Sequence, residues 1–152
     1  MSRGGAWTIL ILLLVFLYLP FLGKAFHVDD RIYLETAKNI LEKPLFPYDY
    51  PAIFEGLYAP NAASHSHLPL TSYILSLVYM LAGEEAEWPF HLAFLVFPVM
   101  AAWSFLDLSA YLVRRRTAGA ALLISAPAFL VLGHTLMPDV PLLALWLLAL
   151  SR

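Results

Sequence analysis

The residues of this chain best suited to chemistry are two adjacent carboxylates, Asp29 and Asp30. Only five residues separate them from a charge-free stretch of twenty, which runs from Gly4 to Gly23. Neighbouring acids can hold different pKa values, so that one stays ionised and accepts a proton as a general base. At about 1.5 Å per helical residue, the stretch before them spans roughly the 30 Å of a bilayer's hydrocarbon core. The acid pair is therefore predicted to lie at a membrane surface.

A third candidate acid, Asp139, follows a long apolar segment and precedes Pro141. An acid at the end of such a segment is costly unless it faces water, a partner or a substrate, so it is a functional candidate. Helix capping is an equally good interpretation of these acids, because an Asp at a helix start accepts hydrogen bonds from free backbone N–H groups. Capping does not exclude catalysis, since a helix start also fixes the orientation of a carboxylate.

Basic and imidazole side chains that could bind an anion lie close to these acids. Arg31 and Lys24 are the bases nearest the acid pair, and either could pair with a phosphate or with Asp29. His65 and His67 flank one serine, a spacing that puts both imidazoles on one side of an extended chain. Imidazole binds metals when neutral and phosphate when protonated, although a solvated loop pair is slightly favoured here.

Composition identifies the chain as an integral membrane protein. It is 61% hydrophobic and 13% charged, with a mean hydropathy of +0.74, against roughly 25% charged residues in soluble domains. A net charge of −2 and the absence of long basic runs exclude nucleic acid as a partner. Without cysteine there is no disulfide framework or thiolate metal site.

The first element is predicted to be a transmembrane helix over residues 1–23. Arg3 and Lys24 bracket its apolar part, which begins at Trp7. A cleaved signal peptide is the alternative, because Gly23 and Ala25 are small residues of the kind that a signal peptidase prefers. The apolar run exceeds the usual length of a signal peptide's hydrophobic region, and later segments keep the chain in the membrane in either case.

The positive-inside rule orders the remaining segments. Arg114, Arg115 and Arg116 form the basic cluster and should share the cytoplasmic side with Arg3, so an odd number of crossings separates them from Asp29. The rival count makes 68–83 a full span, which would put Asp29 and Asp139 on opposite faces. His91 and His134 are interpreted as hydrogen-bonded helix residues within these segments. The predicted parts are an extracytoplasmic loop at 24–87, a second span at 88–113, a cytoplasmic turn at 114–116, a third span at 117–138, and the truncated start of a fourth at 139–152.

The extracytoplasmic loop is predicted to contain two helices at the membrane interface. Residues 29–43 carry one apolar stripe with a three-and-four spacing, which is typical of a short amphipathic helix. Residues 68–83 are apolar, but they are interrupted by hydroxyl residues and followed by acids, which favours a helix lying in the interface. Between them, four prolines and several aromatic residues exclude long regular structure, and the pattern leaves open whether this part is ordered.

The order of these features resembles the N-terminal part of the GT-C glycosyltransferases. The resemblance is carried by His27-Val28-Asp29-Asp30-Arg31-Ile32-Tyr33 after a first span, by His67-Leu68-Pro69-Leu70 with Tyr73 and Gly83, by the basic turn, and by Met137-Pro138-Asp139. It is closest to the protein O-mannosyltransferase and aminoarabinose transferase group, glycosyltransferase family 39. This likeness implies an all-α integral membrane protein with the GT-C fold, whose first extracytoplasmic loop contains interface helices.

The resemblance also implies roles for individual residues. Asp29 is the expected base that activates the acceptor, Asp30 takes the place of a second acid that is commonly Glu, and Asp139 lies by the same cavity. His67 occupies a position that contacts phosphate or metal in some members, which makes it the candidate ligand of a divalent metal. Leu68 stands where part of the group has a basic residue, so the donor is not identified. The residues expected to contact substrate are Arg31, Tyr33, His65 and His67.

The sequence thus predicts the N-terminal part of a glycosyltransferase that moves a sugar from a polyprenyl-phosphate carrier to a lipid, glycan or protein acceptor. The expected partners are membrane lipid, the lipid-linked sugar donor and the remainder of a longer enzyme chain. We expect a multi-pass protein of the plasma or inner membrane, with its active side outside the cytoplasm. The alternatives are a non-catalytic membrane module that binds lipid or a partner, and a transporter fragment, which acids within the spans would suggest.

Overall fold

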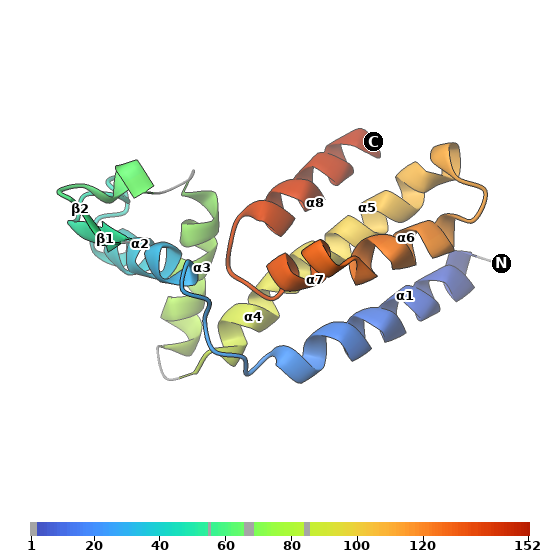
Figure 1. Cartoon of the computed structure of the whole chain (residues 1–152), viewed down its shortest axis with the longest axis horizontal. Coiled ribbons are helices and arrows are strands. Elements are labelled where there is room, and N and C mark those ends of the chain that lie inside the picture. The colour runs from blue at the N-terminus through green and yellow to red at the C-terminus, as the bar shows by residue number, and fades with distance from the viewer. Residues whose placement is uncertain (1–2, 55, 66–68, 84–85) are drawn as a thin grey trace.

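The computed structural model describes residues 3–54, 56–65, 69–83 and 86–152, and it is mainly helical (Figure 1). Two helical segments, Gly4–Phe21 and Trp88–Leu112, are long and apolar enough to cross a membrane. A third crossing exists if the bent pair Arg116–Ser125 and Pro127–Gly133 is counted as one span. These segments indicate a membrane protein, as the composition predicts.

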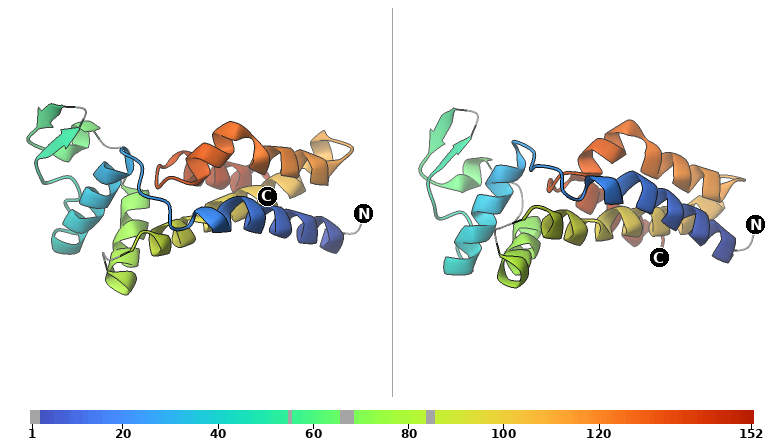
Figure 2. Two further views of the ribbon diagram at one scale, coloured as in Figure 1. Left: turned by 60° about the horizontal axis from the view of Figure 1, so that its bottom comes forward. Right: turned by 90° about the horizontal axis from the view of Figure 1, so that it is seen from below.

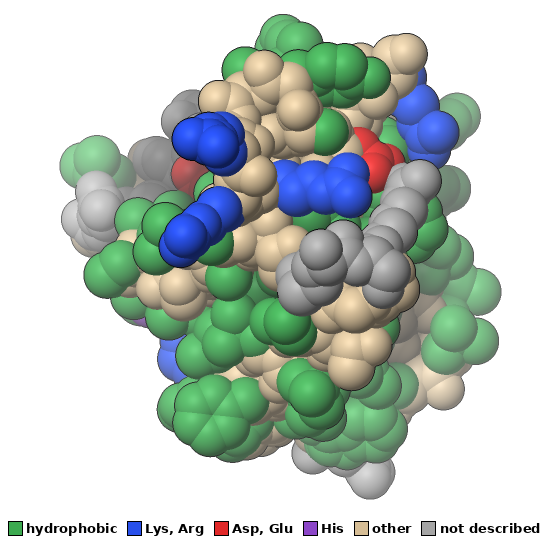
Figure 3. Space-filling view, turned by 90° about the vertical axis from the view of Figure 1, so that its right-hand side faces the viewer, with side chains coloured by type: hydrophobic (Ala, Val, Ile, Leu, Met, Phe, Trp, Pro, Cys, Tyr) green, Lys and Arg blue, Asp and Glu red, His purple; other side chains and the backbone are tan. Residues whose placement is uncertain are grey.

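Four helical segments form a bundle in which the chain reverses direction at each step (Figures 1 and 2). The N-terminus and the turn between the second and third segments lie at one end, which we call the basic end. Basic side chains gather there, and Arg114, Arg115 and Arg116 are exposed (Figure 3). In chain order the bundle consists of α1 (Arg3–Tyr18) with η1 (Leu19–Phe21), α4 (Trp88–Phe94) with α5 (Val96–Leu112), α6 (Arg116–Ser125) with α7 (Pro127–Gly133), and α8 (Asp139–Leu150).

The third segment is bent, whereas the sequence predicts one continuous helix over 117–138. α6 and α7 meet at an angle of 59°. Ala126, the residue between them, has extended backbone angles (φ −61°, ψ 133°) because the ring of Pro127 disfavours a helical conformation in the preceding residue. The helical part also stops at Gly133, so this segment is not one continuous helix to residue 138, and its crossing of a membrane stays a prediction.

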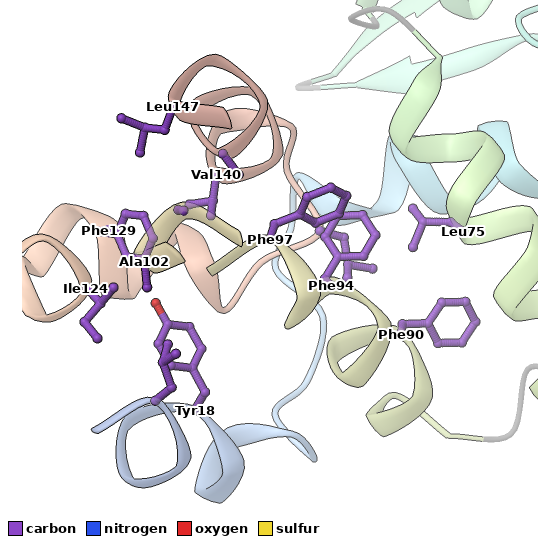
Figure 4. Packing of buried hydrophobic residues seen from close by; sticks show 14 of the residues in the cluster. Tyr18, Leu75, Phe90, Phe94, Phe97, Ala102, Ile124, Phe129, Val140 and Leu147 are labelled. Atoms are coloured by element: carbon purple, nitrogen blue, oxygen red, sulfur yellow. The ribbon is translucent and has the colours of Figure 1, made fainter. Parts of the chain in front are cut away.

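Small residues let the bundle helices pack closely. Ala101, Ala102, Ala120 and Ala144 are fully buried on α5, α6 and α8. Small side chains allow helix backbones to approach, which is the usual basis of helix association in lipid. Larger residues fill the space between these contacts, and Figure 4 shows Ile124, Phe129 and Val140 among them.

The part of the chain between the first two bundle segments folds at the opposite end, which we call the loop end. It contains α2 (Asp30–Glu42), a short hairpin and α3 (Leu70–Ala82), and α3 runs across the direction of the bundle helices in each view (Figures 1 and 2). α2 buries Tyr33, Ala37 and Ile40 of the predicted apolar stripe, whereas its fourth member, Leu41, is exposed. α3 leaves Leu77, Met80 and Leu81 exposed. It has thirteen residues, fewer than a full membrane span needs, and its predicted place at the membrane interface stays a prediction.

The proline-rich segment after α2 is ordered in its described residues. β1 (Ala52–Phe54) and β2 (Leu57–Ala59) form an antiparallel hairpin, and Gly56 adopts a positive φ of 78° at its turn. The amide of Asn39 donates to the carbonyls of Phe46 (2.8 Å) and Pro47 (3.0 Å). The hydroxyls of Thr36 and Tyr50 lie 2.8 Å apart. These hydrogen bonds hold the segment against α2, a point that the sequence pattern leaves open.

Candidate functional site

Asp30 is completely buried at the start of α2, where it joins two distant parts of the chain. One carboxylate oxygen accepts a hydrogen bond from the backbone N–H of His27 (2.7 Å). The other accepts one from the backbone N–H of Leu136 (2.8 Å), 106 residues further along the chain. Asp30 thereby fixes the segment that leads into α8 against the first turn of α2.

The environment of Asp30 favours a structural role over that of a free base. Burial raises the pKa of its carboxyl above the usual value, while the two N–H donors, and the nearby His91 and His27 more weakly, oppose that rise. Both oxygens already accept backbone hydrogen bonds. Asp30 therefore joins the start of α2, which carries Asp29, to the segment before Asp139, and its predicted catalytic role receives no support from this geometry.

Asp29 has the more open position of the two. Its side chain is 32% exposed, and one carboxylate oxygen lies 3.4 Å from Nδ1 of His27. Asp29 occupies the N-cap position of α2, but its side chain makes no capping hydrogen bond. The capping interpretation thus fails for Asp29 and leaves its carboxylate available. Sequence reasoning assigned no role to His27, although its place two residues before Asp29 was a usable signal.

The phenol of Tyr33 is influenced by all three candidate acids. Its side chain is only 5% exposed, and burial is the largest cause that raises the pKa of its phenol to about 12. The charges of Asp139, Asp29 and Asp30 contribute next, in that order. The hydrogen bond from Leu136 to Asp30 brings the segment before Asp139 against the start of α2, so Asp29 and Asp139 lie at the same end of the molecule. The membrane face that they share and their chemical role stay predictions.

Two helix starts position these acids. α2 begins at Asp30, and α8 begins at Asp139 with Pro138 at its N-cap and Pro141 in its first turn. The predicted cap at Asp139 is therefore displaced by one residue. Acids in a first helical turn are stabilised by the positive end of the helix dipole, so both helices favour negative charge at this site.

Arg31 lies apart from the acid pair, on the exposed face of α2. Its Nε donates to the Glu35 carboxylate at 2.6 Å, one helical turn further on. Arg31 and Glu35 line a separate hollow of about 420 Å³, together with Tyr50 and Ile53 near the hairpin. The predicted contact of Arg31 with substrate at the acid site is therefore not favoured by this placement.

The remaining predicted contacts are only partly within the described structure. His65 ends η2 (Ala62–His65), but its side chain lies outside the described residues, as does the whole of His67. Among the residues that the structure describes, no three His, Asp or Glu side chains form a group that could hold a metal ion. The predicted metal ligand therefore stays a prediction.

The two histidines of the apolar segments are hydrogen-bonded, as predicted. Nε2 of His91 lies 2.9 Å from the carbonyl oxygen of Lys24, which ties α4 to the end of the first segment. His134 approaches the carbonyl of Leu130 through Nδ1 (2.6 Å) and that of Leu17 through Nε2 (3.0 Å). Its ring also stacks on Tyr18 of α1. His91 therefore joins α4 to the loop after the first segment, and His134 joins α7 to α1.

Comparisons with protein-family models, with curated proteins and with solved structures found no match for this chain. The likeness to GT-C glycosyltransferases consequently rests on the sequence motifs alone.

Proposed function

We propose that this chain supplies the acid-bearing part of a membrane glycosyltransferase that uses a polyprenyl-phosphate sugar as donor. The main support is the arrangement around Tyr33, where a partly exposed Asp29 beside His27 shares its surroundings with Asp139. The order of the motifs along the sequence points to the same class of enzyme. The acid site would face the outside of the cytoplasm, because the basic cluster lies at the other end of the bundle.

In the proposed reaction, Asp29 acts as the general base. The acceptor hydroxyl attacks the anomeric carbon of the sugar while Asp29 takes its proton. The bond between that carbon and the phosphate oxygen breaks, and the polyprenyl phosphate leaves with the bonding electron pair. His27 lies beside the Asp29 carboxylate, with its Nδ1 accepting from the Asp29 backbone N–H (3.3 Å), and Asp30 fixes the backbone on which both residues lie. General-base assistance of this kind contributes about 10² to 10⁴ in rate.

The test is sugar transfer from labelled polyprenyl-phosphate sugars by membranes that contain the full protein. Asp29→Asn should lower transfer by about 10² to 10⁴ and leave the thermal midpoint unchanged. The matched control is Asp49→Asn, which removes an exposed acid paired with Lys43 and should be neutral. Normal transfer by Asp29→Asn would reject the assignment.

Asp30 provides a second, contrasting variant. Asp30→Ala would leave the buried N–H groups of His27 and Leu136 without acceptors, at about 1 to 3 kcal/mol each. We therefore expect a lower thermal midpoint together with lower transfer. A loss of transfer with unchanged stability would instead give Asp30 a direct chemical role.

A further inference from the structure

An apolar groove runs along the side of the bundle, between the end of α1 and α7. Its volume is about 680 Å³, and Phe16, Phe21, Leu130 and Val131 are among its lining residues. Phe16, Phe21 and Val131 are each more than half exposed. The groove therefore opens on the flank of the candidate span Gly4–Phe21 and of α7, the second half of the bent pair, where hydrocarbon chains of a bilayer can enter sideways.

One cation lies among the groove's lining residues. Lys24 comes three residues after Phe21, the last residue of the first apolar span, and is half-buried. Its backbone is fixed on both sides, because its N–H donates to the carbonyl of Phe21 (3.0 Å) and its carbonyl contacts His91. Among the ion pairs found between described residues, none includes its ammonium group.

The other polar lining residue, His134, is held in place by contacts with the protein. Both of its ring nitrogens lie against backbone carbonyls, and one face of its ring covers Tyr18. A neutral imidazole donates to only one of these carbonyls, but both nitrogens are turned toward the backbone of α7 and α1. Lys24 is therefore the lining residue whose polar group can face an anion in the groove.

We propose that this groove binds an anionic glycerophospholipid of the surrounding bilayer. One acyl chain lies between α1 and α7, and the phosphate faces the ammonium group of Lys24. The apolar and charged parts of the groove follow in the same order as those of such a lipid. The hydrocarbon chain would contact Phe16 and Val131, and the negative headgroup would face Lys24, the cation after the apolar span. A partner helix would cover the apolar walls but leave that charge without a counterpart. The proposal does not depend on the proposed sugar transfer.

The bound lipid would lie close to the acid site through the covalent chain. Lys24 precedes His27 by three residues, and His134 precedes Leu136, the donor to Asp30, by two. The two segments that begin at the groove, Lys24 to His27 and His134 to Leu136, thus provide the backbone N–H groups that donate to Asp30. Occupation of the groove should therefore stabilise the loop end.

The experiment measures lipid binding to the purified full chain in a neutral detergent by native mass spectrometry. The probes are dioleoylphosphatidylglycerol, which is anionic, and dioleoylphosphatidylcholine, which is zwitterionic. A basic residue at a membrane surface changes the affinity for anionic lipid about fivefold. We expect the protein to prefer the anionic probe by about that factor and Lys24→Gln to remove the preference. Lys43→Gln is the matched control, because it removes a lysine outside the groove.

A second pair of variants tests the apolar walls. Val131→Trp should fill the groove and weaken binding of both probes, whereas Leu122→Trp places the same ring on an exposed α6 position outside the lining and should leave binding unchanged. A preference that survives Lys24→Gln, or normal binding by a folded Val131→Trp variant, would overturn the proposal. So would a polyprenyl phosphate that binds at Lys24 while phosphatidylglycerol does not compete, which would give the groove to the lipid carrier instead. Loss of transfer in Asp29→Asn leaves these outcomes unaffected, so the two proposals fail separately.

Discussion

The titration of Tyr33 tests the central geometry of the candidate site, namely that Asp29 and Asp139 act on one place. Burial and these carboxylates raise the pKa of the Tyr33 phenol from its ordinary 10.0 to about 12. We expect Asp139→Asn to lower that pKa, because it removes the largest of the charge contributions, but not to 10, because burial is the largest cause overall. Asp29→Asn should lower it by a smaller amount.

The same shift makes a statement about stability. The folded pKa lies above the unfolded value, so the neutral phenol is favoured by folding and its contribution is fully present below pH 10. As the pH rises from 10 to about 12, the unfolded chain loses this proton first and that contribution disappears. A rise from 10.0 to about 12 corresponds to roughly 2 to 3 kcal/mol of stability over this window. Tyr33→Phe should remove this part of the alkaline decline.

The assay is carbon-13 NMR of protein labelled at the tyrosine ring carbon that bears the hydroxyl, between pH 8 and 12. The Tyr33 signal is assigned as the one that Tyr33→Phe removes. Asp49→Asn is the control, since Asp49 is not among the charges that raise this pKa. If the Tyr33 midpoint is the same in Asp139→Asn as in the unmodified protein, the two acids do not share a site and the catalytic proposal loses its support.

Two further predictions concern packing and topology. A Cβ atom at Gly133 would stand 2.7 Å from the hydroxyl oxygen of Tyr18, so Gly133→Ala should lower the free energy of unfolding by about 1 to 3 kcal/mol in a denaturant titration. Adding Tyr18→Phe removes that oxygen and should restore part of the loss. If the effects of the two substitutions simply add in the double variant, this contact is contradicted. Because the chain has no cysteine, Val28→Cys and Arg115→Cys report the two ends of the bundle, and an impermeant maleimide should label the first in intact cells and the second only after permeabilisation. Labelling of both from the same side would restore the rival count with an additional crossing.

Local patterns predicted the elements whose cause is local. The charge-free stretch predicted α1, and the apolar stripe from Tyr33 to Ile40 predicted the buried face of α2. Hydropathy averaged over residues 117–138 does not predict the bend between α6 and α7, because it carries no information about the backbone at Pro127. Proline removes a backbone donor and restricts its predecessor whatever the hydropathy of its neighbours, so this signal should have taken precedence.

The sequence indicated the acids of the candidate site, but not the place of Arg31, the contact of His27 or the hydrogen bonds of Asp30. The positive-inside rule placed Asp29 and Asp139 at one end, because it counts crossings rather than contacts. No rule of spacing could show that Asp30 accepts a hydrogen bond from the N–H of Leu136, since that contact depends on how the whole bundle closes. The turn of Arg31 toward Glu35 follows from the three-and-four spacing on a helix and was open to prediction.

The bond between Asp30 and Leu136 also sets a time at which this end of the protein can mature. A ribosome adding roughly 5 to 20 residues per second needs roughly 5 to 20 s to travel the 106 residues between these partners. Until then the carboxylate has no distant donor, and the first loop cannot complete its contact with the segment that leads into α8. The acid-bearing end therefore closes only after Leu136 has been made, and a nascent chain arrested before that residue would lack this hydrogen bond.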